Sequence, residues 1–261
     1  MAIEGIHTFC WFELATTGCS ETLRFYEQLF GWTSTRVPMG GEMGDYIMLQ
    51  QGDAPVGAMF EMTPETGLGH MPPNWSAYVL VENVDTSTRK AQQLGAKVFK
   101  EPFDVMGMGR MSILQDPTGA VINLWQATGE GPQATIDYRA KGRVCWCDQQ
   151  SRDIAAATEF YNKLFGWRTE RKDGEYIQFF SGDSPLGGFF DLTKQPNLGD
   201  IPASWILYFA TDDVDASVTR VKELGGQIHM PGMDMEGVGR MAVVADPKGA
   251  VFTLFRLNDE H

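Results

Sequence analysis

Two periods alternate along this chain, one typical of strands and one of helices. Residues 7–15, HTFCWFELA, are dense in aromatic and apolar groups and predict a strand. From Ser20 to Phe30 the spacing changes: Leu23, Tyr26 and Leu29 fall on one helical face, with polar residues between them. The N-terminal stretch therefore predicts a strand followed by an amphipathic helix.

The remainder of the first half continues with strands and one further helix. Gly31 ends the first helix, and Asp85 is predicted to cap a second helix that reaches Leu94 and closes at Gly95. Strands are predicted at 46–50, 56–61, 75–81, 97–100, 110–115 and 120–126. With a return strand beginning at Trp32, the order strand, helix, three strands occurs twice in this half.

The second half repeats the first. FYEQLFGW at 25–32 returns as FYNKLFGW at 160–167, a spacing of 135 residues, and GRMSILQDPTGAVINLW at 109–125 returns as GRMAVVADPKGAVFTLF at 239–255. The later match has a spacing of 130, so the first copy carries five extra residues between Trp32 and Tyr46. The chain is a tandem duplication. We predict one domain at 1–126, a polar linker at 127–143 and a second domain at 144–261.

Composition excludes several classes of partner. The net charge of −13 argues against nucleic acid and anionic membrane surfaces, both of which need a basic footprint. No apolar run has the length of a membrane span, and the N-terminus lacks the features of a signal peptide. The four cysteines form neither a zinc spacing nor a disulfide framework. These features favour a cytoplasmic protein with reduced thiols.

The order of motifs resembles the vicinal oxygen chelate superfamily, which includes glyoxalase I, extradiol dioxygenases and the bleomycin- and fosfomycin-resistance proteins. The FYxxLFGW unit, the helix that ends in LGA or LGG and the DPxGAV hairpin carry the resemblance through nearly the whole chain, twice. It implies an α+β fold in which each half contains two βαβββ units that form a curved sheet around a cleft. The superfamily hosts several chemistries, so the fold alone implies no activity.

The same resemblance implies four metal-ligand positions in each half, normally His and Glu. They fall on Trp11, Glu61, Ser76 and Asn123 in the first half, and on Trp146, Asp191, Ile206 and Thr253 in the second. Only Glu61 and Asp191 could coordinate a metal strongly, and no histidine occurs at any of the eight positions. We therefore expect no metal and no other cofactor.

Strand alternation predicts which other residues line each cleft. Glu13 shares strand parity with Trp11, and Asp148 shares it with Trp146. By the same parity the lining residues are Tyr78, Leu80, Asn123 and Trp125 in the first half, and Ile206, Tyr208, Thr253 and Phe255 in the second. Aromatic walls with one or two carboxylates suit a flat apolar or cationic small molecule. Alternatively, the aromatic side chains fill the clefts.

Several functions remain open at this point. The first is metal-free binding of a small aromatic molecule, as in the resistance proteins. The second is a metal-independent enzyme in which Glu13 or Asp148 transfers protons, paired with Glu61 or Asp191. A metal-dependent lyase, dioxygenase or hydroxylase with unusual ligands and a structural protein with filled clefts are further alternatives. In the last case Glu13 and Asp148 are hydrogen-bonded strand residues or partners of Arg110 and Arg240.

For the binding hypothesis the first cleft, which is the more polar, is predicted to be the functional one. The predicted contacts are Trp11, Glu61, Ser76, Tyr78, Asn123, Trp125, Trp146, Asp191, Tyr208, Thr253 and Phe255. The only expected partner is the small molecule, and the protein is expected to be a monomer or a homodimer.

Overall fold

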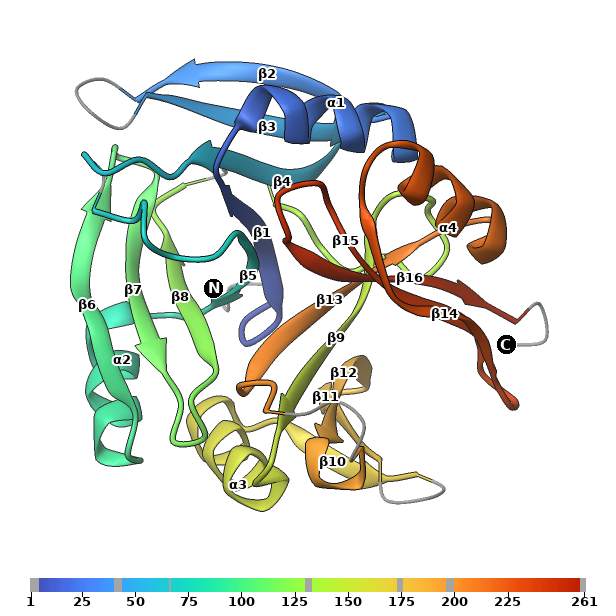
Figure 1. The fold of residues 1–261 in the computed structure, drawn as a ribbon. Coiled ribbons are helices and arrows are strands. Elements are labelled where there is room, and N and C mark those ends of the chain that lie inside the picture. The colour runs from blue at the N-terminus through green and yellow to red at the C-terminus, as the bar shows by residue number, and fades with distance from the viewer. Residues whose placement is uncertain are drawn as a thin grey trace. The chain divides into compact units, whose positions relative to one another are not determined.

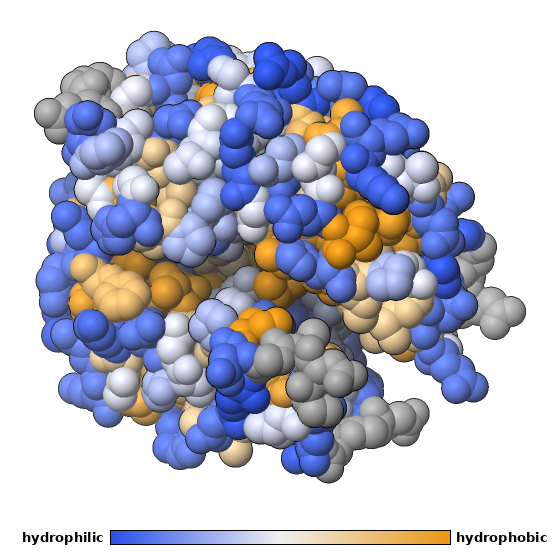
Figure 2. All heavy atoms as spheres, viewed as in Figure 1, coloured by the Kyte–Doolittle hydropathy of each residue, from blue (hydrophilic) through white to orange (hydrophobic). Residues whose placement is uncertain are grey.

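Two eight-stranded sheets and four α-helices make up the protein in its computed structural model, which describes residues 5–39, 44–65, 67–129, 133–172, 176–195 and 200–258 (Figure 1). The predicted linker 127–143 is described except at 130–132. Within these residues no helix is long and apolar enough to cross a membrane. Hydrophilic residues cover much of the face drawn in Figure 2, in keeping with a net charge of −13.

The first sheet is formed by the first half of the chain. Its elements are β1 (Phe9–Thr16), α1 (Cys19–Phe30), β2 (Thr33–Pro38), β3 (Asp45–Gln51), β4 (Ala54–Glu61), β5 (Asn74–Leu80), α2 (Val84–Gln93), β6 (Lys97–Val105), β7 (Gly109–Gln115) and β8 (Val121–Ala127). The strand order is β2-β3-β4-β1-β5-β8-β7-β6. β1 pairs with β4, and β5 with β8, in parallel, while the hairpins pair antiparallel.

The second sheet repeats this arrangement. It contains β9 (Val144–Ser151), α3 (Ile154–Phe165), β10 (Arg168–Arg171), β11 (Ile177–Ser181), β12 (Ser184–Asp191), the short 3-10 helix η3 (Leu192–Lys194), β13 (Ser204–Ala210), α4 (Val214–Glu223), β14 (Gln227–Met235), β15 (Gly239–Ala245) and β16 (Val251–Leu257). The order β10-β11-β12-β9-β13-β16-β15-β14 is that of the first sheet. The predicted α+β fold with its βαβββ repeat is confirmed.

Helix ends follow the local sequence, with one correction. Gly31 closes α1 in the left-handed conformation, at φ 78°, as predicted. The predicted cap of α2 at Asp85 is wrong. The cap is Asn83, whose side chain accepts a hydrogen bond from the Thr86 N–H at 2.8 Å. Asp85 instead binds Arg110.

Compact units of the chain combine elements from both sequence halves. One unit, here called unit 1, comprises Met1–Trp11, Ser76–Gln133 and Cys147–Ile206. The other, unit 2, comprises Phe12–Trp75, Ala134–Trp146 and Leu207–His261. Each contains most of one βαβββ module from each half. The division of the chain at 127–143 rests on the repeat and stays a prediction.

The repeated tyrosine of the FYxxLFGW motif is a buried structural residue in both units. In unit 2 the Tyr26 hydroxyl donates to Asp246 at 3.2 Å and accepts from the Trp75 indole at 2.9 Å. In unit 1 the Tyr161 hydroxyl makes the equivalent contacts, with Asp116 at 2.9 Å and Trp205 at 3.0 Å. Both aspartates belong to the DPxG turns. The FYxxLFGW tyrosine of each half is therefore hydrogen-bonded to the DPxG turn of the other half.

The tryptophan of the same motif also has a backbone partner. The Trp32 indole donates to the Gly142 carbonyl at 2.8 Å in unit 2, and the Trp167 indole donates to the His7 carbonyl at 2.7 Å in unit 1. His7 and Gly142 both have positive φ, 61° and 72°. They occupy equivalent places just before the first strand of each half. The tyrosine and the tryptophan of the motif therefore stabilise the fold.

Candidate functional site

Aromatic side chains from three strands of unit 1 gather where the family places its ligands. Trp11 on β1, Tyr78 on β5 and Trp125 on β8 pack in one apolar cluster with Leu80 and Met111. Tyr78 pairs in register with Asn123, and Leu80 with Trp125. Trp11 and Trp125 are partly exposed, whereas Tyr78 and Asn123 are buried. The cluster also contains Cys10 and is joined by Ile6, Phe103, Val105, Ile113 and Ala127.

The equivalent strands of unit 2 carry a second aromatic group. Trp146 on β9 lies 6.2 Å from the Tyr138 ring, and Tyr208 on β13 lies 6.1 Å from Phe255 on β16, in an edge-to-face arrangement. Tyr208 pairs in register with Thr253. Thr253 is 1% exposed, and its hydroxyl has no hydrogen-bond partner among the described residues.

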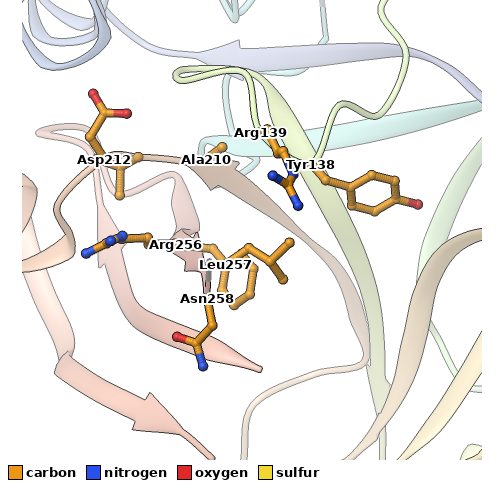
Figure 3. Close-up of a pocket in the computed structure, with 9 residues that line it drawn as sticks. Tyr138, Arg139, Ala210, Asp212, Arg256, Leu257 and Asn258 are labelled. Atoms are coloured by element: carbon orange, nitrogen blue, oxygen red, sulfur yellow. The ribbon is translucent and has the colours of Figure 1, made fainter. Parts of the chain in front are cut away.

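A pocket of about 290 Å³ adjoins this second group and lies within unit 2 (Figure 3). Residues that follow β13, the end of β16 and the segment before β9 form its walls. They are Tyr138, Arg139, Ala210, Thr211, Asp212, Phe255, Arg256, Leu257 and Asn258. Of the predicted contact residues, only Phe255 lines it. The pocket lies on residues of the linker and the second half, whereas the sequence favoured the first half, and which half binds a ligand stays a prediction.

Each half holds a carboxylate bound by a tyrosine. The Tyr46 hydroxyl donates to Glu13 at 2.6 Å in unit 2, and the Tyr176 hydroxyl donates to Asp148 at 2.5 Å in unit 1. Asp148 is buried and Glu13 partly so. Such short distances are typical of hydrogen bonds to a charged acceptor. Both carboxylates are therefore held by a proton donor.

The residue that pairs with each acid on the neighbouring strand differs in size between the two halves, as the acid differs in length. In unit 2 Ala58 pairs in register with Glu13, and in unit 1 Gly188 pairs with Asp148. A Cβ added at Gly188 would lie 2.0 Å from the Tyr176 oxygen, so the phenol occupies the space that Ala58 fills in the other half. The shorter acid, Asp148, is thus combined with the smaller neighbour.

Glu61 and Asp191 both have backbone partners. The Glu61 carboxylate accepts hydrogen bonds from the Gly18 and Cys19 N–H groups, the latter at 2.7 Å, at the start of α1. Asp191 caps η3 and accepts from the Thr193 N–H and hydroxyl, at 2.8 and 2.6 Å. These contacts satisfy helix termini. The contribution of Glu61 and Asp191 to a ligand site stays a prediction.

Arg110 and Arg240 have carboxylate partners other than the two candidate catalytic acids. Arg110 binds Asp85 through two nitrogens, at 2.8 and 3.0 Å, and Asp104 at 2.9 Å. Arg240 makes the equivalent contacts with Asp215 and Asp234. The alternative that placed Glu13 and Asp148 opposite these arginines is therefore wrong. Each guanidinium instead ties the start of a helix to the adjacent β-hairpin.

The donor set does not fit the metal that the family implies. The ligand positions hold two indoles, an isoleucine, an amide and two hydroxyls besides Glu61 and Asp191, whose carboxylates bind backbone N–H groups. No group of three or more His, Cys, Asp or Glu that could hold an ion occurs in the part of the chain that the structure describes. No step of a reaction is therefore assigned to a metal here.

Sequence reasoning missed two parts of the site. Tyr46 and Tyr176 were recognised only as strand residues, although they occur at the same place in the two copies, 130 residues apart. That repetition was a usable signal. The pocket beside Phe255 had no comparable signal, because its volume depends on how the linker segment packs against β13 and β16.

Fold and site together define a tandem βαβββ protein with clustered aromatic side chains on the central strands of both units. The chain matches the Glyoxalase/Bleomycin resistance protein/Dioxygenase superfamily over residues 7–124 and 143–254, and it belongs to this family.

Relatives that match nearly the whole chain include a protein named as a glyoxylase and one named as an anthracycline biosynthesis protein. The chain is 33% identical over 250 residues to the Mycobacterium tuberculosis protein named "Putative glyoxylase CFP32", covering 94% of this chain and 93% of the relative. It is 31% identical over 263 residues to the "Anthracycline biosynthesis protein DnrV" of Streptomyces peucetius, covering 95% and 93%.

Solved structures share the fold at low identity. The 2,3-dioxygenase LapB from Pseudomonas sp. KL28 aligns with a TM-score of 0.63 at 13% identity, covering 97% of this chain and 93% of that one. The Mn(II)-bound glyoxalase from Novosphingobium aromaticivorans aligns with a TM-score of 0.64 at 13% identity, covering 97% and 83%. At this identity the likeness establishes the fold alone.

Proposed function

We propose that the protein binds a small, planar aromatic molecule without the help of a metal. The observation that carries this proposal is the group of aromatic side chains around one tryptophan in each unit. Trp11 replaces the first ligand in one half and packs with Tyr78 and Trp125. Trp146 replaces it in the other half, beside Tyr138. Flat aromatic walls with few polar groups favour stacking of a planar ligand.

The names of the relatives agree with this ligand class. Two Streptomyces relatives are named anthracycline biosynthesis proteins, a name that refers to aromatic compounds. Sequestration would need only the aromatic walls, because a binding protein does not have to stabilise a transition state.

Equilibrium binding on metal-depleted protein tests the proposal. The protein is dialysed against EDTA, its metal content is measured by mass spectrometry, and 1-hydroxyanthraquinone is titrated while tryptophan fluorescence is recorded. We expect saturable binding that EDTA leaves unchanged and that Trp11→Ala or Trp146→Ala weakens about tenfold, with Trp75→Phe, a buried tryptophan outside the clusters, as the control. About one equivalent of bound metal, or binding that requires added Fe²⁺, Mn²⁺ or Zn²⁺, would contradict the proposal.

A second function is favoured by the two tyrosine–carboxylate pairs. Glu13 with Tyr46, and Asp148 with Tyr176, are donor–acceptor pairs of the kind used in proton transfer. The pairs recur in both halves although the acid differs in length. An acid/base enzyme would use the carboxylate as the base and the tyrosine to position it.

Metal-depleted protein also tests this second function. The first substrates are adducts of an α-oxoaldehyde with a thiol, the class that the word glyoxylase denotes. We expect Glu13→Gln or Asp148→Asn to lower kcat at least a hundredfold. Tyr46→Phe or Tyr176→Phe should shift the acidic limb of the plot of kcat against pH. If turnover is unchanged in both carboxamide variants, the acid/base assignment is wrong.

A further inference from the structure

The pocket of unit 2 lies at a place where unit 1 carries larger side chains. Backbone hydrogen bonds establish the equivalence: the His7 N–H donates to the Leu80 carbonyl at 2.8 Å, and the Gly142 N–H donates to the Ala210 carbonyl at 2.8 Å. The next residue repeats the pattern, since Val81 and Thr211 donate to the Trp125 and Phe255 carbonyls, each at 2.8 Å. Ala210 and Phe255 therefore stand where unit 1 has Leu80 and Trp125.

Differences in side-chain size account for the open volume. In unit 1 Leu80 and Trp125 pack against Ile6 in the apolar cluster. In unit 2 the smaller Ala210 and Phe255 replace the first two, and Lys141 replaces Ile6. Lys141 is exposed and its ammonium lies 3.4 Å from Asp212, so its charge is held at the surface. The result is the pocket of about 290 Å³.

More basic than acidic side chains line this pocket, although the whole chain is acidic. Two guanidinium groups, those of Arg139 and Arg256, line it (Figure 3). The single carboxylate in the lining, Asp212, pairs with Lys141. In a protein of net charge −13 this is a locally cationic site. Guanidinium groups bind carboxylates with good geometry.

Apolar surface completes the lining. Tyr138 and Phe255 supply two aromatic rings, and Leu257 and Ala210 supply aliphatic surface. Asn258 adds one side-chain amide. Pockets for small molecules typically combine such apolar walls with a few charged or polar groups that fix orientation.

We propose that this pocket binds an aromatic carboxylate, with the ring against Tyr138 and Phe255 and the carboxylate at Arg139 and Arg256. The inference deepens the proposed function and rests on it, because it names the charge of the ligand and the half of the chain that holds it. It predicts that a ligand with a carboxylate binds in this pocket of unit 2.

Isothermal titration calorimetry with 2-naphthoate and its neutral isostere 2-naphthamide tests the proposal. We expect the carboxylate to bind at least tenfold more tightly than the amide. Arg256→Gln, which introduces the residue found in the first half, should lower the affinity for naphthoate about tenfold and leave that for naphthamide unchanged. Lys222→Gln, an exposed residue of α4 outside the pocket, makes the same change in charge and should alter neither.

A volume variant tests the position of the site independently of charge. Ala210→Leu restores the first-half residue and should abolish binding of both compounds, with thermal unfolding used to verify that the variant is folded. Equal affinities for naphthoate and naphthamide, or an equal loss in Lys222→Gln, would overturn the charge assignment while the proposed aromatic binding stands. Tight naphthoate binding that Ala210→Leu leaves intact would overturn the location. Failure of both compounds and of 1-hydroxyanthraquinone to bind would overturn both proposals.

Discussion

Substitution of Gly188 by alanine is a direct test of the match between acid length and neighbour size. Gly188 is buried on β12, and an added Cβ would lie 2.0 Å from the Tyr176 oxygen and 2.1 Å from its Cζ. No real Cβ contact is that short, so the phenol has to move and its hydrogen bond to Asp148 is lost. The change therefore removes one specific hydrogen bond without removing either partner.

The expected magnitude follows from that lost bond. A hydrogen bond to a charged group contributes about 1.5–3 kcal/mol, and overpacking adds about 1 kcal/mol, the lower end of its range, because the phenol moves away. Alanine in a strand would otherwise stabilise by about 0.5–1 kcal/mol relative to glycine. We therefore expect Gly188→Ala to lower the free energy of unfolding by about 2 kcal/mol. For a chain of this size that corresponds to a decrease of about 4–8 °C in Tm.

A double-mutant cycle makes the test specific. Asp148→Glu combined with Gly188→Ala recreates the pair formed by Glu13 and Ala58 in the other half, so the double variant should recover about half of the loss. Tm is measured by circular dichroism for wild type, both single variants and the double variant. A Gly188→Ala protein at least as stable as wild type, or purely additive effects in the double variant, would refute the reasoning.

Three further predictions concern buried polar groups. Tyr26→Phe removes a hydroxyl that donates to Asp246 and accepts from Trp75, so each buried partner loses this hydrogen bond. We expect the free energy of unfolding, measured by chemical denaturation, to fall by about 2 kcal/mol. An unchanged midpoint would contradict this. Burial raises the pKa of Asp246, so the folded state keeps a proton that the unfolded state releases, and this residue's contribution to stability falls as pH rises from the usual Asp value through the raised one. Asp246→Asn should remove that fall, and parallel plots of Tm against pH for the variant and wild type would count against it. Burial also raises the pKa of the Cys10 and Cys19 thiols to about 12, so iodoacetamide at about pH 8 should label neither in the folded protein and both in urea; mass spectrometry that finds rapid labelling of the native protein would disprove this.

Local patterns in the sequence were sufficient for the fold. The repeat of FYxxLFGW and DPxG established the duplication, and Gly31 closed its helix because a left-handed residue is needed there. Strand alternation placed Trp11, Tyr78 and Trp125 on one side, where they pack in one cluster. Alternation reports the face of a strand, because successive side chains point to opposite sides.

Partners of the polar groups were decided by tertiary structure alone. Alternation placed Glu13, and the family resemblance placed Glu61, at candidate positions, but neither says which donor each carboxylate reaches. Glu61 binds the start of α1 and Glu13 binds Tyr46, because β1, β3 and β4 lie side by side in the sheet. The tie between Tyr26 and Asp246 joins residues 220 positions apart, a contact that no local pattern encodes.

The identities of the residues in the ligand positions could be read from the sequence, and so could the poor fit of these residues to a metal. Whether the space beside them is open or filled could not. The same backbone place is packed in unit 1 and open in unit 2, because Ala210 and Phe255 leave volume that Leu80 and Trp125 occupy. Open volume is the difference between the space a backbone encloses and the side chains that fill it, and it exists only once both halves of the chain have packed.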